Sequence, residues 1–375
     1  MTGLVYVSPL PWHSFAQRPH KFVEWFHARH GGPVLWIDPY PTRLPGLEDL
    51  RRLRTKLRGR PPPAARALPG WLTVLPAPAL PIEPLPGSGL LNGLLWRKLH
   101  QAVARFGADG DCLLAIGKPS KLALQLMRRH PQLPALFDIM DDFPAFYTGL
   151  SSRSMAAREQ EVALQVRQVL VSSSFLAQRF AACGERLGLA LNACAIETLP
   201  PLDQLPARPA TPVLGYVGTI AQWFDWDMVI ALALAHPAIP VRLIGPVFGT
   251  IPSQLPANIV LLPACQHQQA IAHMQTFSVG LIPFKRTTLT QSVDPIKYYE
   301  YRALGLPVLS SRFGEMAVRG ELPGVFLADA QDDPVQLVRR ALRHADAPAD
   351  IAAFRARHSW EAHFDAAQIR LGVTP

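Results

Sequence analysis

Short apolar segments alternate with segments of helical periodicity along the sequence, and the pattern restarts after a proline-rich stretch. Strands that alternate with helices of about 10–15 residues form βαβ units and parallel sheets. The sequence therefore predicts an α/β protein with two doubly wound, Rossmann-like domains that face each other across a cleft. Ligands in such domains bind beyond the carboxyl ends of the strands.

The proline-rich stretch between Leu199 and Pro212 sets the expected domain boundaries. We expect a first domain over residues 1–200, a linker over 201–212, a second domain over 213–355, and a terminal helical segment over 356–375 that packs back toward the first domain. Strands are expected at Leu4–Val7, Val34–Ile37, Cys112–Ile116, Ala135–Met140, Val169–Val171, Val213–Val217, Val241–Ile244, Ile259–Leu262, Val279–Pro283, Val308–Ser310 and Val325–Leu327. Helices are expected at Pro19–Arg29, Ser120–Arg129, within Met155–Val166, and at Phe175–Arg186, Asp225–Ala235, His267–Met274, Pro295–Leu304, Val335–His344 and Trp360–Arg370.

Composition excludes several classes of protein. Of the 375 residues, 49% are hydrophobic and 17% charged, which is typical of a globular protein and not of a disordered one. The four cysteines form no CxxC pair or Cys/His cluster, so we expect no disulfide framework and no structural zinc site. The first residues lack the pattern of a signal peptide, and no apolar run reaches the ~18 residues of a membrane span. We expect a cytoplasmic protein, peripheral to the membrane at most.

The net charge of +9 is concentrated in two places. Arg51–Arg60 holds six cations and no anion. A second group, Arg97, Lys98, His100 and Arg105, follows the leucine-rich segment Leu90–Trp96. One interpretation is a solvated surface. The other is attraction to anionic lipid at the inner face of the membrane or to a phosphate-bearing acceptor. No nucleic-acid-binding pattern accompanies the charge.

The segment from Asp294 to Val308 contains candidate nucleotide-binding residues. Pro295 suits the first turn of a helix, and Lys297 and Glu300 share one face near the helix start. Backbone N–H groups at that start favour a phosphate, the lysine adds a charge, and the glutamate can accept hydrogen bonds from a ribose diol. The alternative is an ordinary ion pair capped by Asp294.

The string DPIKYYEYRALGLPVLSS resembles the nucleotide-sugar segment of GT-B glycosyltransferases of the family-4-like type, and GYVGTI, VRLIGP and VGLIPF resemble the strand ends that precede it. The resemblance implies a GT-B fold and a nucleoside-diphosphate sugar as the donor substrate. Among such donors a UDP-sugar is the first expectation, and no cofactor is expected. Many retaining members carry an acidic residue where this chain has Ser292. The residues that the resemblance implies at the donor are Gly218, Thr219, Gly245, Phe284, Asp294, Lys297, Tyr298 and Glu300.

Three carboxylates lie at the end of a predicted strand in FDIMDDFPAF, namely Asp138, Asp141 and Asp142. A carboxylate there can deprotonate a hydroxyl if crowding or burial raises its pKa toward neutrality. The alternative is that Asp141 or Asp142 caps the following turn.

This string, together with FAQRPH near the amino terminus, resembles bacterial cell-surface polysaccharide glycosyltransferases near the inverting glucuronosyltransferase of xanthan-type exopolysaccharide synthesis. The resemblance implies Asp141 as the general base, with Asp142 and Asp138 as alternatives, and Arg18 and His20 at the acceptor or cleft. It implies an inverting, metal-independent transfer to a hydroxyl of a lipid-linked or cell-surface polysaccharide acceptor, such as a polyprenyl-diphosphate glycan.

Two other functions share these features. A nucleotide-sugar epimerase of GT-B fold uses the same donor residues without an acceptor, and a binding protein senses the sugar nucleotide without turnover. The twelve histidines show no metal-binding spacing, so no metal site is expected.

Overall fold

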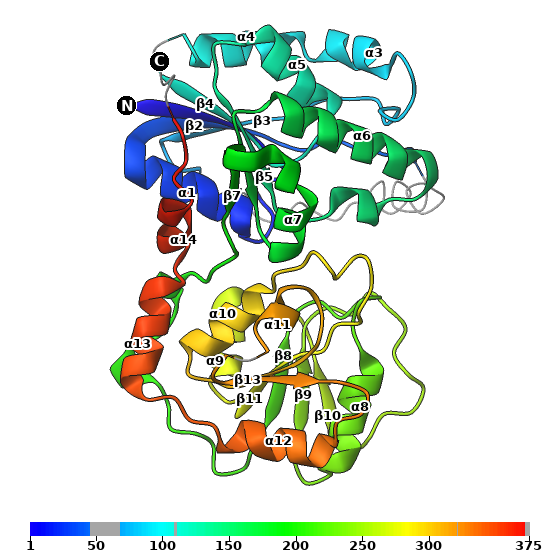
Figure 1. The fold of residues 1–375 in the computed structure, drawn as a ribbon, viewed down its shortest axis with the longest axis vertical. Coiled ribbons are helices and arrows are strands. Elements are labelled where there is room, and N and C mark those ends of the chain that lie inside the picture. The colour runs from blue at the N-terminus through cyan, green and yellow to red at the C-terminus, as the bar shows by residue number, and fades with distance from the viewer. Residues whose placement is uncertain (46–67, 109–110, 321, 372–375) are drawn as a thin grey trace. The chain divides into compact units, whose positions relative to one another are not determined.

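The computed structural model describes residues 1–45, 68–108, 111–320 and 322–371, so the cationic segment Arg51–Arg60 lies outside the described residues. The chain forms two compact units (Figure 1). The first unit comprises Met1–Ser172, Leu176–Ala190 and the segment from Phe364 onward, and the second comprises Ser173–Phe175 and Leu191–His363. Each unit contains one parallel sheet flanked by helices, which confirms the predicted α/β class.

The sheet of the first unit has seven strands in the order β3-β2-β1-β4-β5-β6-β7. Its strands are β1 (Thr2–Val7), β2 (Gly31–Ile37), β3 (Leu72–Leu75), β4 (Cys112–Ile116), β5 (Ala135–Ile139), β6 (Gln168–Val171) and β7 (Leu187–Leu189). The helices are α1 (Arg18–His30), α3 (Ser88–Leu95), α4 (Arg97–Phe106), α5 (Lys121–Arg129), α6 (Gly149–Gln165) and α7 (Ser174–Arg179). Every residue of β4 and β6 is buried, as expected for a parallel sheet that helices cover on both faces.

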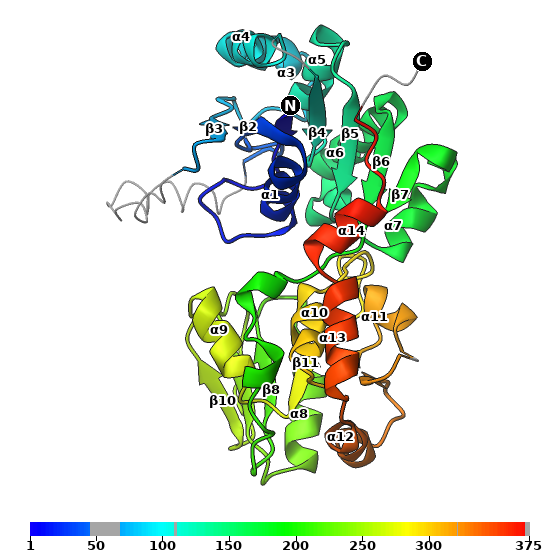
Figure 2. The same cartoon turned by 90° about the vertical axis from the view of Figure 1, so that its left-hand side faces the viewer.

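The end of the described chain belongs to the first unit. The last residues of helix α14 (Trp360–Ala366), from Phe364 on, lie beside α1 in Figures 1 and 2. The ring of Phe364 packs edge-on against Phe22 of α1, with centroids 5.3 Å apart, and Trp25 donates a hydrogen bond of 3.0 Å to Asp365. Residues from both ends of the chain therefore share one core.

The sheet of the second unit has six strands in the order β10-β9-β8-β11-β12-β13. Its strands are β8 (Leu214–Val217), β9 (Val241–Ile244), β10 (Ile259–Leu262), β11 (Val279–Ile282), β12 (Val308–Ser311) and β13 (Val325–Ala328). The helices are α8 (Trp226–Ala235), α9 (His267–Met274), α10 (Ile296–Ala303), α11 (Gly314–Val318), α12 (Pro334–Arg343) and α13 (Pro348–Arg357).

Helix α10 is fixed closely against this sheet through one side chain. The ring of Tyr301 lies over Gly280 of β11, where a Cβ would come within 2.3 Å of the ring, so only glycine fits. The Tyr301 hydroxyl accepts a hydrogen bond of 3.1 Å from the backbone N–H of Val217 in β8. These contacts hold the helix that carries Lys297 and Glu300 at a fixed distance from β8 and β11.

The structure adds elements that the sequence pattern did not predict. Strands β3 and β7 are edge strands of four and three residues, too short for a clear alternation. Helix α13 begins at Pro348 in a stretch rich in Ala, Asp and Pro that reads as a loop. The helix expected over Phe175–Arg186 ends at Arg179 and continues as a 3-10 turn in which Gly184 has φ +56°. The helix expected over Trp360–Arg370 ends at Ala366.

No helix in the described ranges is both long and apolar enough to cross a lipid bilayer.

Candidate functional site

Each sheet has one place where the strand order reverses, and this is where doubly wound folds bind ligands. In the first unit it lies between β1 and β4, and in the second between β8 and β11. The residues predicted from the sequence follow strands at or next to these two places, except Asp138, which lies within β5.

Asp141 follows β5, the strand beside β4, and keeps part of its surface exposed. Its carboxylate has no hydrogen-bond or ion-pair partner among the described residues. Burial of the group by surrounding protein raises its pKa to about 7, the nearby Arg18 opposes this, and the charge of Asp142 adds to it. A carboxyl group with this pKa exchanges a proton near neutral pH.

Asp142 is the next residue, but its environment differs. Arg179 donates a hydrogen bond of 2.5 Å to its Oδ1. The same guanidinium forms an ion pair with Glu159 of α6, whose side chain is fully buried. Burial raises the pKa of Glu159 to about 7, although Arg179 opposes the shift. Asp142 is therefore bound into a three-residue ionic cluster.

Asp138 lies within β5 and is fully buried with Arg18. The Arg18 guanidinium donates hydrogen bonds of 2.9 and 2.7 Å to Oδ1 of Asp138, and one of 2.6 Å to the carbonyl of Ala190. The Tyr6 hydroxyl donates to the other carboxylate oxygen at 3.3 Å. Burial, reinforced by the Asp138 charge, raises the pKa of Tyr6 well above its ordinary value. This network joins β1, α1, β5 and β7 in the interior.

His20 is also an interior residue. Its ring lies between Trp12 and Trp36, with both centroids 5.0 Å away. Nδ1 accepts a hydrogen bond of 3.2 Å from the backbone N–H of Gln17, so Nε2 carries the proton and donates to the carbonyl of Trp12 at 3.0 Å. The structure thus places Arg18 and His20 as buried supports of the loop after β1.

In the second unit two glycine loops meet beyond β8 and β9. A Cβ on Gly245 would lie 2.0 Å from the carbonyl oxygen of Gly218, so the backbones approach as closely as glycine permits. The N–H of Gly218 donates to the carbonyl of Ile244 at 2.9 Å, and the Tyr216 hydroxyl donates to the carbonyl of Thr219 at the same distance. The loop that contains Gly218 and Thr219 is held in one position.

Lys297 and Glu300 lie in the first turns of α10 and form an ion pair. The Lys297 side chain keeps 24% of its surface exposed, and that of Glu300 keeps 6%. Nδ1 of His267, at the start of α9, lies 4.0 Å from the other carboxylate oxygen of Glu300. A cation and an acceptor thus occur together at one helix start, as expected for a diphosphate next to a ribose.

Asp294 and Tyr298 belong to a buried network beside this pair. Asp294 accepts hydrogen bonds of 2.8 Å from both Arg319 and the Tyr299 hydroxyl, and one of 2.7 Å from the backbone N–H of Asn192. The Arg319 guanidinium lies 4.1 Å from the centroid of the Tyr298 ring. Both residues are in a position to orient the start of α10.

Phe284 follows β11, and its half-buried ring packs at 5.1 Å against Phe313. The backbone N–H of Phe284 donates to the Ser311 hydroxyl at 3.1 Å. The residue therefore links the ends of β11 and β12.

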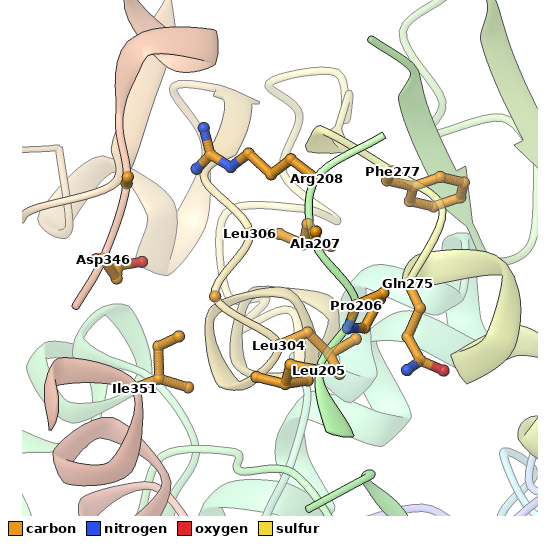
Figure 3. A pocket seen from close by; sticks show the side chains of 12 residues that line it. Leu205, Pro206, Ala207, Arg208, Gln275, Phe277, Leu304, Leu306, Asp346 and Ile351 are labelled. Carbon is orange, nitrogen blue, oxygen red and sulfur yellow. The ribbon is translucent and has the colours of Figure 1, made fainter. Parts of the chain in front are cut away.

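Two hollows in the second unit lie away from the carboxyl ends of β8 and β11, the two strands where the order reverses. A cavity of about 160 Å³ lies at the amino ends of β11 and β12, lined by Leu304, Leu306 and Phe277 among others (Figure 3). Arg208 and Asp346 at its rim are already bonded, to the carbonyl of Leu342 and to Arg302. An open groove of about 470 Å³ runs between the end of β10 and α9 and includes Cys265.

Several residues in this arrangement have no local signal in the sequence. Arg179 and Glu159 surround Asp142 from 37 and 17 positions along the chain, and Arg319 contacts Asp294 from 25 positions away. Only His267 stands where the sequence gives a signal, at the start of a predicted helix. That signal does not predict that its ring lies near Glu300. Among the described residues no group of three or more His, Cys, Asp or Glu side chains is arranged to hold a metal ion.

Comparison with known proteins identifies the fold. Sucrose-phosphate synthase from Thermosynechococcus elongatus superposes with a TM-score of 0.65 at 15% identity, over 97% of this chain and 96% of that one. HepE from Anabaena in complex with UDP-glucose superposes with a TM-score of 0.60 at 12% identity, over 98% and 97%. The chain has the GT-B fold, and the expected resemblance to GT-B glycosyltransferases is confirmed.

No model of a known protein family matches the chain. TuaH of Bacillus subtilis (strain 168), named as a teichuronic acid biosynthesis glycosyltransferase, is 26% identical over 132 residues. The matched part is 34% of this chain and 33% of TuaH, so the chain aligns with about a third of that relative's length.

Proposed function

We propose that the protein is a glycosyltransferase that moves a sugar from a nucleoside-diphosphate sugar to a hydroxyl of an acceptor. The donor that we propose is a UDP-sugar. The single observation that carries this proposal is Asp141, an unpartnered carboxyl group with a pKa of about 7 beyond the end of β5. TuaH is named as a glycosyltransferase, and HepE was solved with UDP-glucose, which supports the same reaction class and donor.

In the proposed reaction Asp141 of the first unit takes the proton of the acceptor hydroxyl. The oxygen attacks the anomeric carbon from the face opposite the diphosphate, the new C–O bond forms, and the bond to the diphosphate breaks with its electron pair. The product is inverted, and the proton on Asp141 passes to water. Asp138 and Asp142 are ion-paired with Arg18 and Arg179, which favours Asp141 as the base.

The second unit holds the donor in this proposal. Lys297 binds the diphosphate at the start of α10, Glu300 accepts the ribose hydroxyls, and the loops at Gly218 and Gly245 allow the backbone to approach the phosphates. Thr219 lies next to the phosphates in this proposal. Asp294 and Tyr298 orient the start of α10, and Phe284 orients the ends of β11 and β12. Fixed cations and N–H groups can stabilise a departing diphosphate electrostatically, so the transfer needs no divalent metal. A large loss of activity with EDTA would contradict that part.

Thermal unfolding with UDP, GDP, ADP, CDP and dTDP tests the donor, with Lys297→Ala as the variant and Arg339→Ala on α12 as the matched control. A ligand at 100 times its Kd stabilises a protein by ~2.7 kcal/mol, which is a shift of several degrees. We expect one nucleotide to shift wild type and control, and to shift Lys297→Ala less. No shift with any nucleotide contradicts the proposal.

Product analysis with the nucleotide sugar alone separates the two alternatives. An epimerase converts the sugar nucleotide without an acceptor, and a binding protein binds it without releasing the diphosphate. A glycosyltransferase releases UDP in proportion to the acceptor supplied.

We further propose a lipid-linked or cell-surface polysaccharide acceptor at an anionic membrane surface, as in exopolysaccharide synthesis. Helix α3 supports this, because it exposes several leucines to solvent. Exposed apolar patches of this kind are typical of surfaces that bind a membrane or another protein. Helix α4 follows directly, with Arg97, Lys98 and Arg105 exposed. Cations near an anionic membrane contribute ~1 kcal/mol each. The exposed fractions are 81% for Leu90, 53% for Leu91, 58% for Leu94 and 45% for Leu95.

Flotation with liposomes of phosphatidylglycerol or phosphatidylcholine tests this surface. We expect binding to the anionic vesicles only, and loss of binding in Leu90→Gln/Leu94→Gln. Leu164→Gln on α6, where the leucine is 76% exposed, is the matched control and should bind like wild type. Equal binding to both lipids, or to neither, contradicts the proposal.

A further inference from the structure

Two cations lie in the loop after β11, one of the two strands where the order of the second sheet reverses. Lys285 and Arg286 are exposed, and neither side chain has a hydrogen-bond or ion-pair partner among the described residues. Most other cations near the strand ends of this unit are engaged: Lys297 pairs with Glu300, Arg312 with Asp329, and Arg319 with Asp294.

The register of the sheet places these two cations beside the first glycine loop. Gly280 of β11 lies opposite Gly215 of β8, and continuing the pairing brings Pro283 next to Gly218. Just beyond, the N–H of Lys285 donates a hydrogen bond of 2.7 Å to the carbonyl of Trp223, in the loop that follows β8. The backbones of the two loops are therefore joined at Lys285.

The loop after Lys285 is also held from its far side. The buried Thr290 hydroxyl donates to the carbonyl of Lys285 and accepts from the N–H of Thr287 at 3.0 Å. The backbone of Lys285 is thus bonded through both its N–H and its carbonyl. Because the backbone is already fixed, anion binding has to order only the two cationic side chains and not the loop that carries them.

The proposed donor needs more positive charge than Lys297 supplies. A diphosphate carries at least two negative charges, and the leaving group gains another as the bond to the sugar breaks. The Lys297 charge is already shared with Glu300, and the loop over residues 218–225 contains no Lys or Arg. We propose that Lys285 and Arg286 bind the diphosphate of the nucleotide sugar and stabilise it as it departs. This inference rests on the proposed function.

Calorimetric titration of the full chain tests it with three probes of increasing charge. These are the nucleoside, the monophosphate and the diphosphate of the base that stabilises the wild type. The variants are Lys285→Ala, Arg286→Ala and the double variant. Arg339→Ala, which removes an exposed arginine on α12, is the matched control.

We expect each single variant to weaken diphosphate binding about tenfold, as for loss of one hydrogen bond between charged groups. Nucleoside binding should not change, and the salt dependence of diphosphate binding should fall in the double variant. Unchanged diphosphate affinity in the double variant, with the wild type binding normally, overturns the inference and leaves the proposed function intact. Failure of the wild type to bind any of the nucleotides overturns both.

Discussion

Nη1 of Arg179 donates a hydrogen bond of 2.5 Å to Oδ1 of Asp142. The same guanidinium pairs with Glu159, so one cation serves two carboxylates next to Asp141. Two consecutive aspartates thus have opposite surroundings, one neutralised by an ion pair and the other unpartnered with a pKa near 7.

Replacing Asp141 with Asn should lower kcat about 10²- to 10⁴-fold, because the acceptor hydroxyl loses its general base. In the wild type kcat/KM should rise with pH and level off above about 7, since only the ionised carboxylate accepts the proton. Initial rates of UDP release between pH 5.5 and 9 measure both effects. Asp203→Asn, at an exposed site, is the control. A flat profile, or full activity in Asp141→Asn, would refute the assignment.

The same variant should be more stable than the wild type at alkaline pH. The pKa of Asp141 rises from 3.8 to about 7 in the folded protein, so the folded state binds this proton more tightly than the unfolded state does. The stability of the wild type relative to Asp141→Asn therefore falls as pH increases through this window. Urea unfolding should show the largest difference at pH 8 and a small one near pH 4. A variant less stable than wild type at pH 8 contradicts the shift.

Replacing Arg179 with Ala should move the rising limb of the pH profile to higher pH. The variant removes the positive charge that is paired with Asp142, so the negative charge of Asp142 acts on Asp141 without compensation. A shift of about one pH unit is expected. Arg179→Lys keeps the charge and should restore most of the profile. A lower rate with an unmoved limb would indicate a structural role alone.

Gly245→Ala should abolish nucleotide binding or destabilise the second unit. The new Cβ would lie 2.0 Å from the Gly218 carbonyl oxygen, and Gly245 has φ +145°, so the two loops must separate. Overpacking of this kind costs ~1–3 kcal/mol or more. Gly249→Ala is the matched control, because its Cβ would lie 3.4 Å from the nearest atom. Urea unfolding measures the stability of each variant, and the UDP-induced thermal shift measures its nucleotide binding. Equal behaviour of the two variants would contradict the expectation.

The fold could be predicted from the sequence because buried parallel strands are continuous apolar runs. Strand β4, for example, was expected with the bounds that it has, Cys112–Ile116. The two edge strands of the first sheet, β3 and β7, were missed because pairing on one side alone sustains segments as short as the three residues of β7.

The candidate site could be predicted only in part. The carboxylates were found, but Asp138, Asp141 and Asp142 are the same residue type within five positions of the sequence. What separates them is the pairing with Arg18, 120 positions away, and with Arg179, 37 positions away. The roles of Asp294 and Tyr298 at the donor stay predictions, since the structure places both in the network around Arg319.

The packing of Phe364 on Phe22 has a consequence for synthesis. A ribosome makes the strands of the first unit by residue 190, yet the helix that covers α1 appears only after the whole second unit. The apolar surface around Phe22 and Trp25 must then stay uncovered while about 170 further residues emerge, at roughly 5–20 residues per second. The amino-terminal unit, begun first, is completed last.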